Sequence, residues 1–84
     1  MEKNNQDCLE AIEFALEGKW NSAHEIVQEI KTSNAQWIHA DLHKIEGDES
    51  NSRYWYSLSN LAAYESYLNP TQELKAIKEY LNKI

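Results

Sequence analysis

The sequence predicts an all-α fold: about five antiparallel helices, arranged as two helical hairpins and a C-terminal helix that caps them. Three observations predict this class. The 84 residues include only two glycines and one proline, so few residues interrupt helices. Apolar residues recur every three or four positions in five segments, and no segment alternates as a half-buried strand does. The length fits a single domain over residues 1–84, with residues 1–5 frayed.

The first hairpin is expected to pair residues 6–17 with a helix that begins after Asn21. Gly18 ends the first of these helices, because glycine readily adopts the left-handed conformation that closes a helix. Ser22 and Glu25 have the spacing of a capping box at the start of the second helix. The apolar stripe of that second helix comprises Ala23, Ile26, Val27 and Ile30.

The second hairpin is expected to pair residues 35–46 with a helix that Asp48 or Ser50 can cap. The apolar stripe of residues 35–46 comprises Ile38, Leu42 and Ile45. The apolar side of the following helix comprises Tyr54, Trp55, Leu58, Leu61 and Ala62. The sequence leaves open whether that helix runs unbroken to Leu68 or breaks near residues 59–60.

Residues 69–72, Asn-Pro-Thr-Gln, mark the start of a further helix. Asparagine is a favoured cap, proline fits the first helical position, and glutamine at the third position can complete the cap. The apolar face that follows comprises Leu74, Ile77, Leu81 and Ile84. This helix is the predicted cap of the two hairpins.

The turn of the first hairpin has the pattern Gly-x-aromatic-x-x-Ala, at Gly18, Trp20 and Ala23. This pattern resembles the turn between the two helices of a tetratricopeptide repeat, where a small residue lets the helices approach closely. The second hairpin carries Glu49 and Ser52 at the corresponding aromatic and alanine positions. The resemblance implies stacked helical hairpins and concerns architecture rather than membership of that family.

A longer motif occupies residues 37–56, with the pattern Trp-Ile-His-Ala-x-Leu-His-x-x-Glu-Gly-Asp-x-x-Asn-x-x-Tyr-Trp-Tyr. It resembles the signature of a small family of helical proteins of unknown function. Members of that family also carry an Ala-His-Glu-Ile run, present here at residues 23–26. Asp41, Lys44 and residues 57–58 differ from the residues common in the family. The resemblance implies a helical fold and draws attention to the shared residues, without implying an activity.

The charge distribution argues against nucleic acid as a partner. The formal net charge is −6, whereas phosphate recognition requires clustered lysine and arginine. Residues 1–49 carry eleven carboxylates against four lysines, and residues 50–84 carry three against four basic side chains. The single cysteine, Cys8, cannot form an internal disulfide, and no apolar run suits a membrane span or a signal peptide. We therefore expect a cytoplasmic protein that binds neither nucleic acid nor membrane.

His39, His43 and Glu46 are expected on one face of the third helix, because helical residues three and four apart share a face. Two imidazoles at i and i+4 can reach one metal ion. His24, on the preceding helix, could supply a third nitrogen if the two helices are antiparallel neighbours. The sequence therefore offers a candidate small-ligand or divalent-metal site, with no other cofactor expected. The candidate walls of this site are Trp37, Asp48, Asn51, Tyr54 and Trp55.

Two other interpretations of the histidines remain open. A histidine beside Glu46 or Asp48 can act in acid–base chemistry near neutral pH, although no nucleophile turn or phosphate-binding loop accompanies it. Alternatively, the polar side chains satisfy one another and the helix ends, as a hydrogen-bonded seam between helices. The sequence favours a protein that is not an enzyme.

Tyr56, Tyr64 and Tyr67 are expected on a side of the fourth helix that faces away from the core, unless the last helix folds back over them. Tyrosine is favoured where a partner half-buries a surface. With the small core, this predicts a helical protein-interaction module that binds a protein partner or itself as a homodimer. The alternative function is the ligand or metal site described above.

Overall fold

The computed structural model describes residues 3–84, and the all-α prediction is confirmed there. Its helices are α1 (Lys3–Leu16), α2 (Trp20–Val27), α3 (Ser33–Glu46), α4 (Glu49–Ser59) and α5 (Pro70–Lys83), with a 3₁₀ turn, η1 (Tyr64–Ser66). No strand occurs between residues 3 and 84. Residues 3–5, which were expected to be frayed, belong to α1. Residues 1–2 lie outside the described residues.

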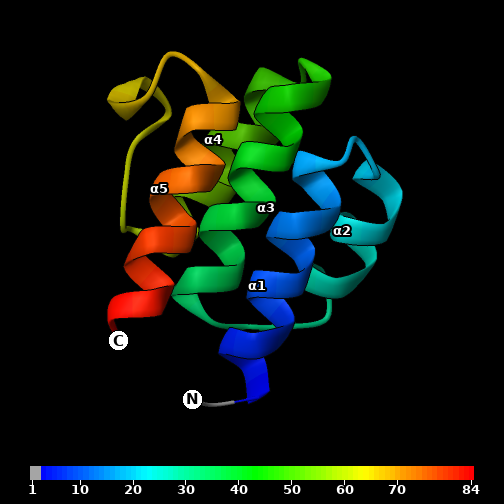
Figure 1. The fold of residues 1–84 in the computed structure, drawn as a ribbon. Helices are drawn as coiled ribbons and strands as arrows, with labels where there is room; N and C mark the ends of the chain where they lie inside the picture. The colour runs from blue at the N-terminus through cyan, green and yellow to red at the C-terminus, as the bar shows by residue number, and fades with distance from the viewer. Residues whose placement is uncertain (1–2) are drawn as a thin grey trace.

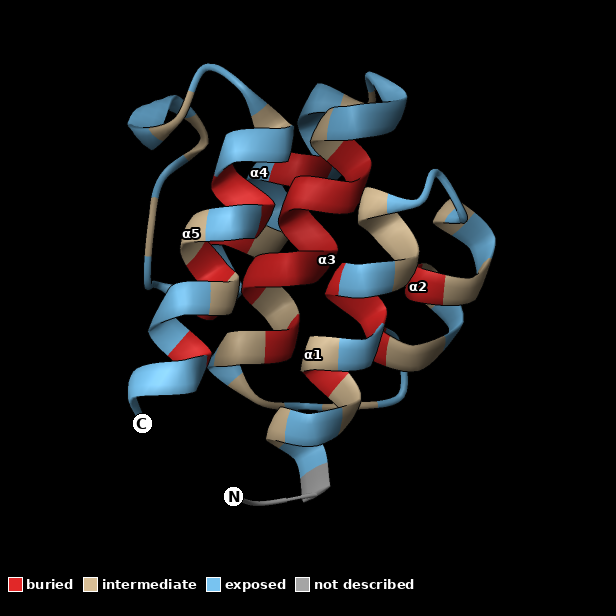
Figure 2. Cartoon of the chain, viewed as in Figure 1, coloured by how far each residue is buried: buried red, intermediate tan, exposed pale blue. Residues whose placement is uncertain are grey.

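α3 is the central helix of the molecule (Figure 1). It packs against all four other helices, most extensively against α4. α1 and α2 form the first hairpin and α3 and α4 the second, while α5 lies against α3 and α1. Every residue from 37 to 43 is buried, so α3 has no solvent-facing side over this stretch (Figure 2). Polar side chains on it must therefore find partners within the protein.

Capping residues set most of the helix boundaries. Thr32, Asp48 and Asn69 precede α3, α4 and α5, and each accepts a hydrogen bond from a backbone N–H three residues later, at 3.0–3.3 Å. Gly18 and Gly47 follow α1 and α3 with φ of +80° and +85°, a conformation that glycine adopts without strain. These local signals explain why the number and order of the helices could be predicted.

The predicted start of α2 is wrong. The helix begins at Trp20, and its N-cap residue Lys19 makes no side-chain capping bond. The capping box expected from Ser22 and Glu25 therefore does not form. The reason is a tight turn, in which the N–H of Lys19 donates to the carbonyl oxygen of Phe14 at 2.8 Å and leads the chain directly into the next helix.

α4 turns a different face to the core from the one predicted. Ser52, Tyr56 and Ser59 are buried, whereas Tyr54 and Leu58 are exposed. The hydroxyl groups of the two serines donate to backbone carbonyl oxygens of α3 at 2.7 and 2.8 Å. These bonds satisfy polar groups inside the hairpin, so a polar face can pack inward.

α4 ends at Ser59 and does not run to Leu68. Asn60 closes it in the left-handed conformation, with φ of +60°. Two carbonyl oxygens of the segment that follows, those of Tyr64 and Tyr67, accept hydrogen bonds from the Lys44 amine at 2.9 and 3.0 Å. This attachment to α3 makes both tyrosines half-buried.

The expected partner surface is therefore wrong for Tyr56, while for the half-buried Tyr64 and Tyr67 it stays a prediction. Tyr56 is almost fully buried, and the other two pack against the hydrophobic core. Ile45, expected in the buried stripe of α3, is instead exposed, in the last turn of the helix. Ile38 and Leu42 are fully buried as the stripe predicted.

Candidate functional site

Three imidazoles meet between α2 and α3. His24 comes from α2, and His39 and His43 lie one turn apart on α3. The Nε2 atoms of His24 and His39 are 3.0 Å apart. One ring nitrogen from each of the three histidines lies within 4.8 Å of the other two. The structure thus brings together the three histidines that the sequence singled out.

Two tryptophans enclose these imidazoles. The Trp20 ring stacks on His24 with centroids 4.7 Å apart, and the Trp55 ring stacks on His39 at 3.8 Å. The indole N–H of Trp20 donates to the carbonyl oxygen of Leu42 at 2.6 Å, which fixes α2 against α3. Trp55 was an expected wall of the site and Trp20 was not. The four-residue spacing of Trp20 from His24 on one helix is the signal that could have found it.

Glu46 orients His43 from the next turn of the same helix. Its carboxylate oxygen Oε1 lies 2.6 Å from Nδ1 of His43. This acceptor favours the tautomer with the proton on Nδ1, so Nε2 keeps its lone pair for a ligand. Carboxylates commonly hold metal-binding histidines in this way.

Burial favours the neutral form of two of the imidazoles. His39 is only 4% exposed, and burial, followed by the neighbouring His24 and His43, lowers its pKa from 6.5 to about 3. The pKa of His24 is also lowered, mainly by burial. Neutral imidazole is the form that binds metal ions. Nδ1 of His39 is buried with no hydrogen-bond partner, so this ring lacks the orienting carboxylate that His43 has.

The other expected wall residues lie further out. Asp48 caps α4 and accepts two hydrogen bonds from Asn51, at 3.3 Å from its backbone and 3.2 Å from its side chain. A carboxylate oxygen of Asp48 also lies within 4.8 Å of a possible metal-ligand atom on His43 and of another on Glu46. Tyr54 is exposed and meets the Trp55 ring edge-on at 5.3 Å.

A second polar cluster, which the sequence analysis missed, lies on the other side of α3. Glu73 of α5 is fully buried and accepts hydrogen bonds from the Trp37 indole at 2.8 Å and from the Tyr56 hydroxyl at 2.6 Å. Its other oxygen pairs with the Lys44 amine at 2.8 Å. Trp37 therefore belongs to this cluster and is not a wall of the histidine site.

Asp41 completes the second cluster and is also fully buried. Neither of its carboxyl oxygens accepts a hydrogen bond from an N–H or O–H group, and its hydrogen-bond partner is the neighbouring Glu73 carboxyl group. Burial, and then the negative charge of Glu73, raise the pKa of Asp41 well above its ordinary value. The sequence gives only a weak signal that these two carboxyl groups are buried. Asp41 precedes the apolar Leu42 in the third helix, and Glu73 lies four residues before Ile77, on the apolar face of α5.

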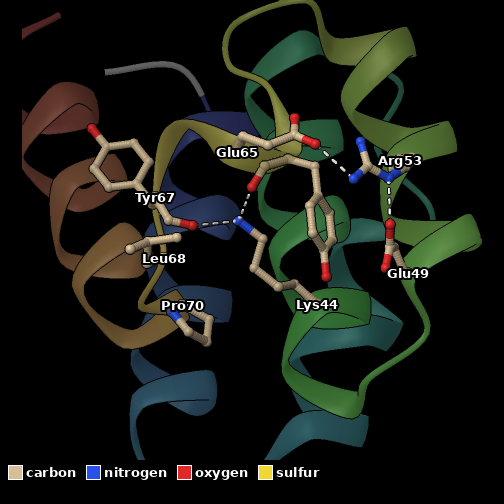
Figure 3. A pocket seen from close by; sticks show the side chains of 8 residues that line it. Lys44, Glu49, Arg53, Glu65, Tyr67, Leu68 and Pro70 are labelled. Carbon is tan, nitrogen blue, oxygen red and sulfur yellow. Dashed lines mark hydrogen bonds and ion pairs between the residues drawn. The ribbon is translucent and has the colours of Figure 1, made fainter.

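A pocket of about 430 Å³ opens beside the second cluster (Figure 3). All three N–H donors of Lys44 are already used, by two backbone carbonyl groups and by Glu73. Arg53, at the rim, pairs with Glu49 at 2.7 Å and with Glu65 at 2.6 Å. Both cations of this pocket are thus committed to partners within the protein. Their contacts hold the segment after α4 in place.

Comparisons of the chain with protein-family models, curated proteins and solved structures found no significant match. The resemblance of residues 37–56 to a family signature therefore stays a prediction. In the part of the chain from residue 3 onward, no helix combines the length and the apolar character that crossing a membrane requires.

Proposed function

We propose that the protein binds a divalent transition-metal ion, such as Zn²⁺, through His24, His39 and His43. The observation that carries this proposal is the close approach of three imidazoles from two helices. Tetrahedral zinc with Zn–N bonds of about 2.0–2.1 Å spaces its nitrogen ligands roughly 3.3 Å apart. The Nε2 atoms of His24 and His39 are already 3.0 Å apart, so this pair needs only a small adjustment, while His43 has a ring nitrogen within 4.8 Å of both.

The donor set indicates the class of ion. Imidazole nitrogens suit Zn²⁺, Ni²⁺ and Cu²⁺, whereas Mg²⁺ and Ca²⁺ prefer oxygen ligands. Three protein ligands leave a fourth position for water or a small anion, as in zinc sites that remain open. Glu46 supports the proposal because it already holds one of the imidazoles in the tautomer that can bind.

A bound ion would connect the two hairpins. His24 belongs to the first hairpin, and the other two ligands belong to the second. Metal binding would therefore stabilise the packing of α2 against α3, and it should raise the stability of the whole chain, because only the folded state assembles the three ligands.

Thermal unfolding and tryptophan fluorescence test the proposal on chelator-treated protein. We expect Zn²⁺ and Ni²⁺ to raise Tm, since an ion at a hundredfold excess over its Kd stabilises the folded state by about 2.7 kcal/mol. Mg²⁺ at the same concentration should leave Tm unchanged. Zn²⁺ should also change the emission of the tryptophans, because Trp20 and Trp55 stack on two of the ligands.

Matched variants separate metal binding from an effect on folding. His39→Gln and His43→Gln each remove a ligand, and we expect both to abolish the zinc-induced rise in Tm. Glu46→Gln should weaken zinc binding by about 10–100-fold, as loss of an orienting carboxylate usually does. Glu29→Gln, which changes an exposed carboxylate elsewhere, should bind zinc as the wild type does. A wild type that does not respond to zinc, or a response that survives both histidine variants, contradicts the proposed site.

A further inference from the structure

α4 presents apolar side chains to solvent. Tyr54 and Leu58 lie one turn apart on its outer side, and Leu61 follows just beyond the end of the helix. Their exposed fractions are 55%, 44% and 40%. A helix at the edge of a small domain normally buries such a stripe against its own core. Here the stripe faces away from the core.

The orientation of α4 is fixed from its inner side. Ser52 and Ser59 donate to backbone carbonyl oxygens of α3, and Tyr56 donates to the buried carboxylate of Glu73. Turning the apolar stripe inward would break these three bonds and leave buried polar groups unpaired, at a cost of about 1–3 kcal/mol for each group. α4 makes extensive contact only with α3 and η1 among the elements of residues 3–84. The outer side of α4 is therefore left without a partner among the described residues.

We propose that the outer face of α4, formed by Tyr54, Leu58 and Leu61, binds the same face of a second copy of this chain. The charge distribution favours this partner. α4 carries one carboxylate, Glu49, and one guanidinium, Arg53, which also pairs with Glu65 of η1, so this region carries little net charge on a chain of formal charge −6. Two copies that approach through the acidic residues 1–49 repel each other, whereas they meet through α4 with little repulsion.

The same charge balance argues against other partners for this face. An anionic membrane attracts clustered lysine and arginine, and a single guanidinium paired with two carboxylates does not provide this. The outer face of α4 likewise carries little net charge with which to attract a strongly acidic or strongly basic peptide. A symmetric contact between copies requires only that the face complement itself, which a stripe of tyrosine and leucine can do.

The proposed dimer should be weak and reversible. A standard stable interface buries about 800 Å² on each partner, which is more than three partly exposed side chains provide. We therefore expect association only toward high micromolar concentrations. The Tyr54 ring meets the Trp55 ring at 5.3 Å, and Trp55 stacks on His39, so the contact would lie close to the histidine cluster without using its ligands.

Sedimentation equilibrium of the full chain in the presence of a chelator tests this proposal independently of metal binding. We expect the mean mass to rise from that of the 9.8 kDa chain toward twice that value between low and high micromolar concentration. Tyr54→Ser combined with Leu58→Ser should remain monomeric. Leu68→Ser is the matched control, because Leu68 is 96% exposed but lies outside α4, and this variant should associate as the wild type does.

Three results would overturn the proposal: a wild type that stays monomeric at high micromolar concentration, association that survives the double variant, or loss of association in Leu68→Ser. A monomeric wild type overturns it even if the face then binds lipid vesicles or another protein. Circular dichroism checks that the double variant is as helical as the wild type. If it is not, Leu58→Ser alone decides, and unchanged association in that folded single variant counts against the proposal.

Discussion

The carboxyl group of Asp41 is buried beside that of Glu73 and accepts no hydrogen bond from an N–H or O–H group, although a carboxylate is among the most costly groups to remove from water. Burial is the main cause of its raised pKa, the charge of Glu73 adds to it, and the nearby Lys44 amine acts in the opposite direction. Protonation removes most of the cost of burial. We therefore expect the folded protein at neutral pH to hold a proton on Asp41 that the unfolded chain releases.

Asp41→Asn should remove a dependence of stability on pH. A raised pKa in the folded state stabilises the protein below the ordinary pKa of aspartate, near 4, and this contribution is lost as pH rises toward the folded-state value. The free energy of unfolding of the wild type should therefore fall between pH 7 and 8.5, by at most about 1.4 kcal/mol per pH unit for one proton. In the variant we expect it to change much less. Urea unfolding at several pH values in the presence of a chelator measures both slopes.

The chosen pH window excludes the other buried titrating groups. The lowered pKa of His39, about 3, gives a contribution that is complete above about 6.5 and lost only as pH falls below it. The pKa of the buried Cys8 thiol is raised to about 11, so its contribution begins to change only above its ordinary value, near 9. If the free energy of unfolding of Asp41→Asn falls with pH as steeply as that of the wild type, the proton that the folded protein holds in this pH range is on another group.

Individual residues were predictable where their partners are close in sequence. His39 and His43 follow from helical spacing alone, and His24 required only that consecutive helices be neighbours. Asp41 and Glu73 lie 32 positions apart, and nothing local to either indicates the other. The burial of these two carboxyl groups beside each other in the core could therefore not be derived from the pattern.

At the scale of helices, periodicity predicted where α4 lies but not which side it buries. Tyr54, Leu58 and Leu61 look like a core stripe, because apolar surface is usually buried. On the opposite side of α4, the hydroxyl groups of two serines donate hydrogen bonds to backbone carbonyl oxygens of α3, and the Tyr56 hydroxyl donates to Glu73. These bonds depend on the tertiary arrangement, so the sequence of the helix alone could not decide between the two sides.

α3 offers a direct test of which apolar residues form the core. Leu42 is fully buried and Ile45 is 41% exposed, although both belong to the predicted stripe. Leu42→Ala should lower the free energy of unfolding by about 2–5 kcal/mol, because it leaves a cavity in a closely packed interior. Ile45→Ala should cost about 1 kcal/mol or less, since Ile45 is partly exposed and its truncation leaves no enclosed cavity. Urea unfolding by circular dichroism compares the two, and equal costs would contradict the observed burial.

At the scale of the whole molecule, the Glu73 carboxylate joins three helices. It pairs with Trp37 and Lys44 from α3 and with Tyr56 from α4, while belonging itself to α5. Lys44 extends this network to the segment after α4 through two carbonyl groups. The C-terminal helix is thus attached to the second hairpin by polar contacts as well as by the packing of its apolar face.

Glu73→Ala should be strongly destabilising. The change leaves the Lys44 amine buried without its counter-charge and removes the acceptor of two other donors, so we expect a loss of about 3–5 kcal/mol in the free energy of unfolding. Glu79→Ala, at an exposed position of the same helix, should cost about 0.5 kcal/mol or less. Chemical unfolding of both variants measures the difference. A Glu73→Ala variant as stable as Glu79→Ala would show that the network contributes little to stability.

The number and order of the helices were predictable because capping residues and periodic apolar residues act over a few positions each. The attachment of α5 through Glu73 was not, because it depends on side chains from three distant segments. The start of α2 was also not predictable, because a backbone turn rather than a side chain begins it.

The network around Glu73 also constrains how this sequence can diverge during evolution. An apolar residue at position 73 would leave the buried Lys44 amine without its counter-charge. An apolar residue at position 44 would likewise leave the buried Glu73 carboxylate without its counter-charge. Replacing both residues by apolar side chains would still leave the buried Trp37 indole and Tyr56 hydroxyl without their acceptor. Descendants of this chain should therefore keep Glu73 and Lys44 together.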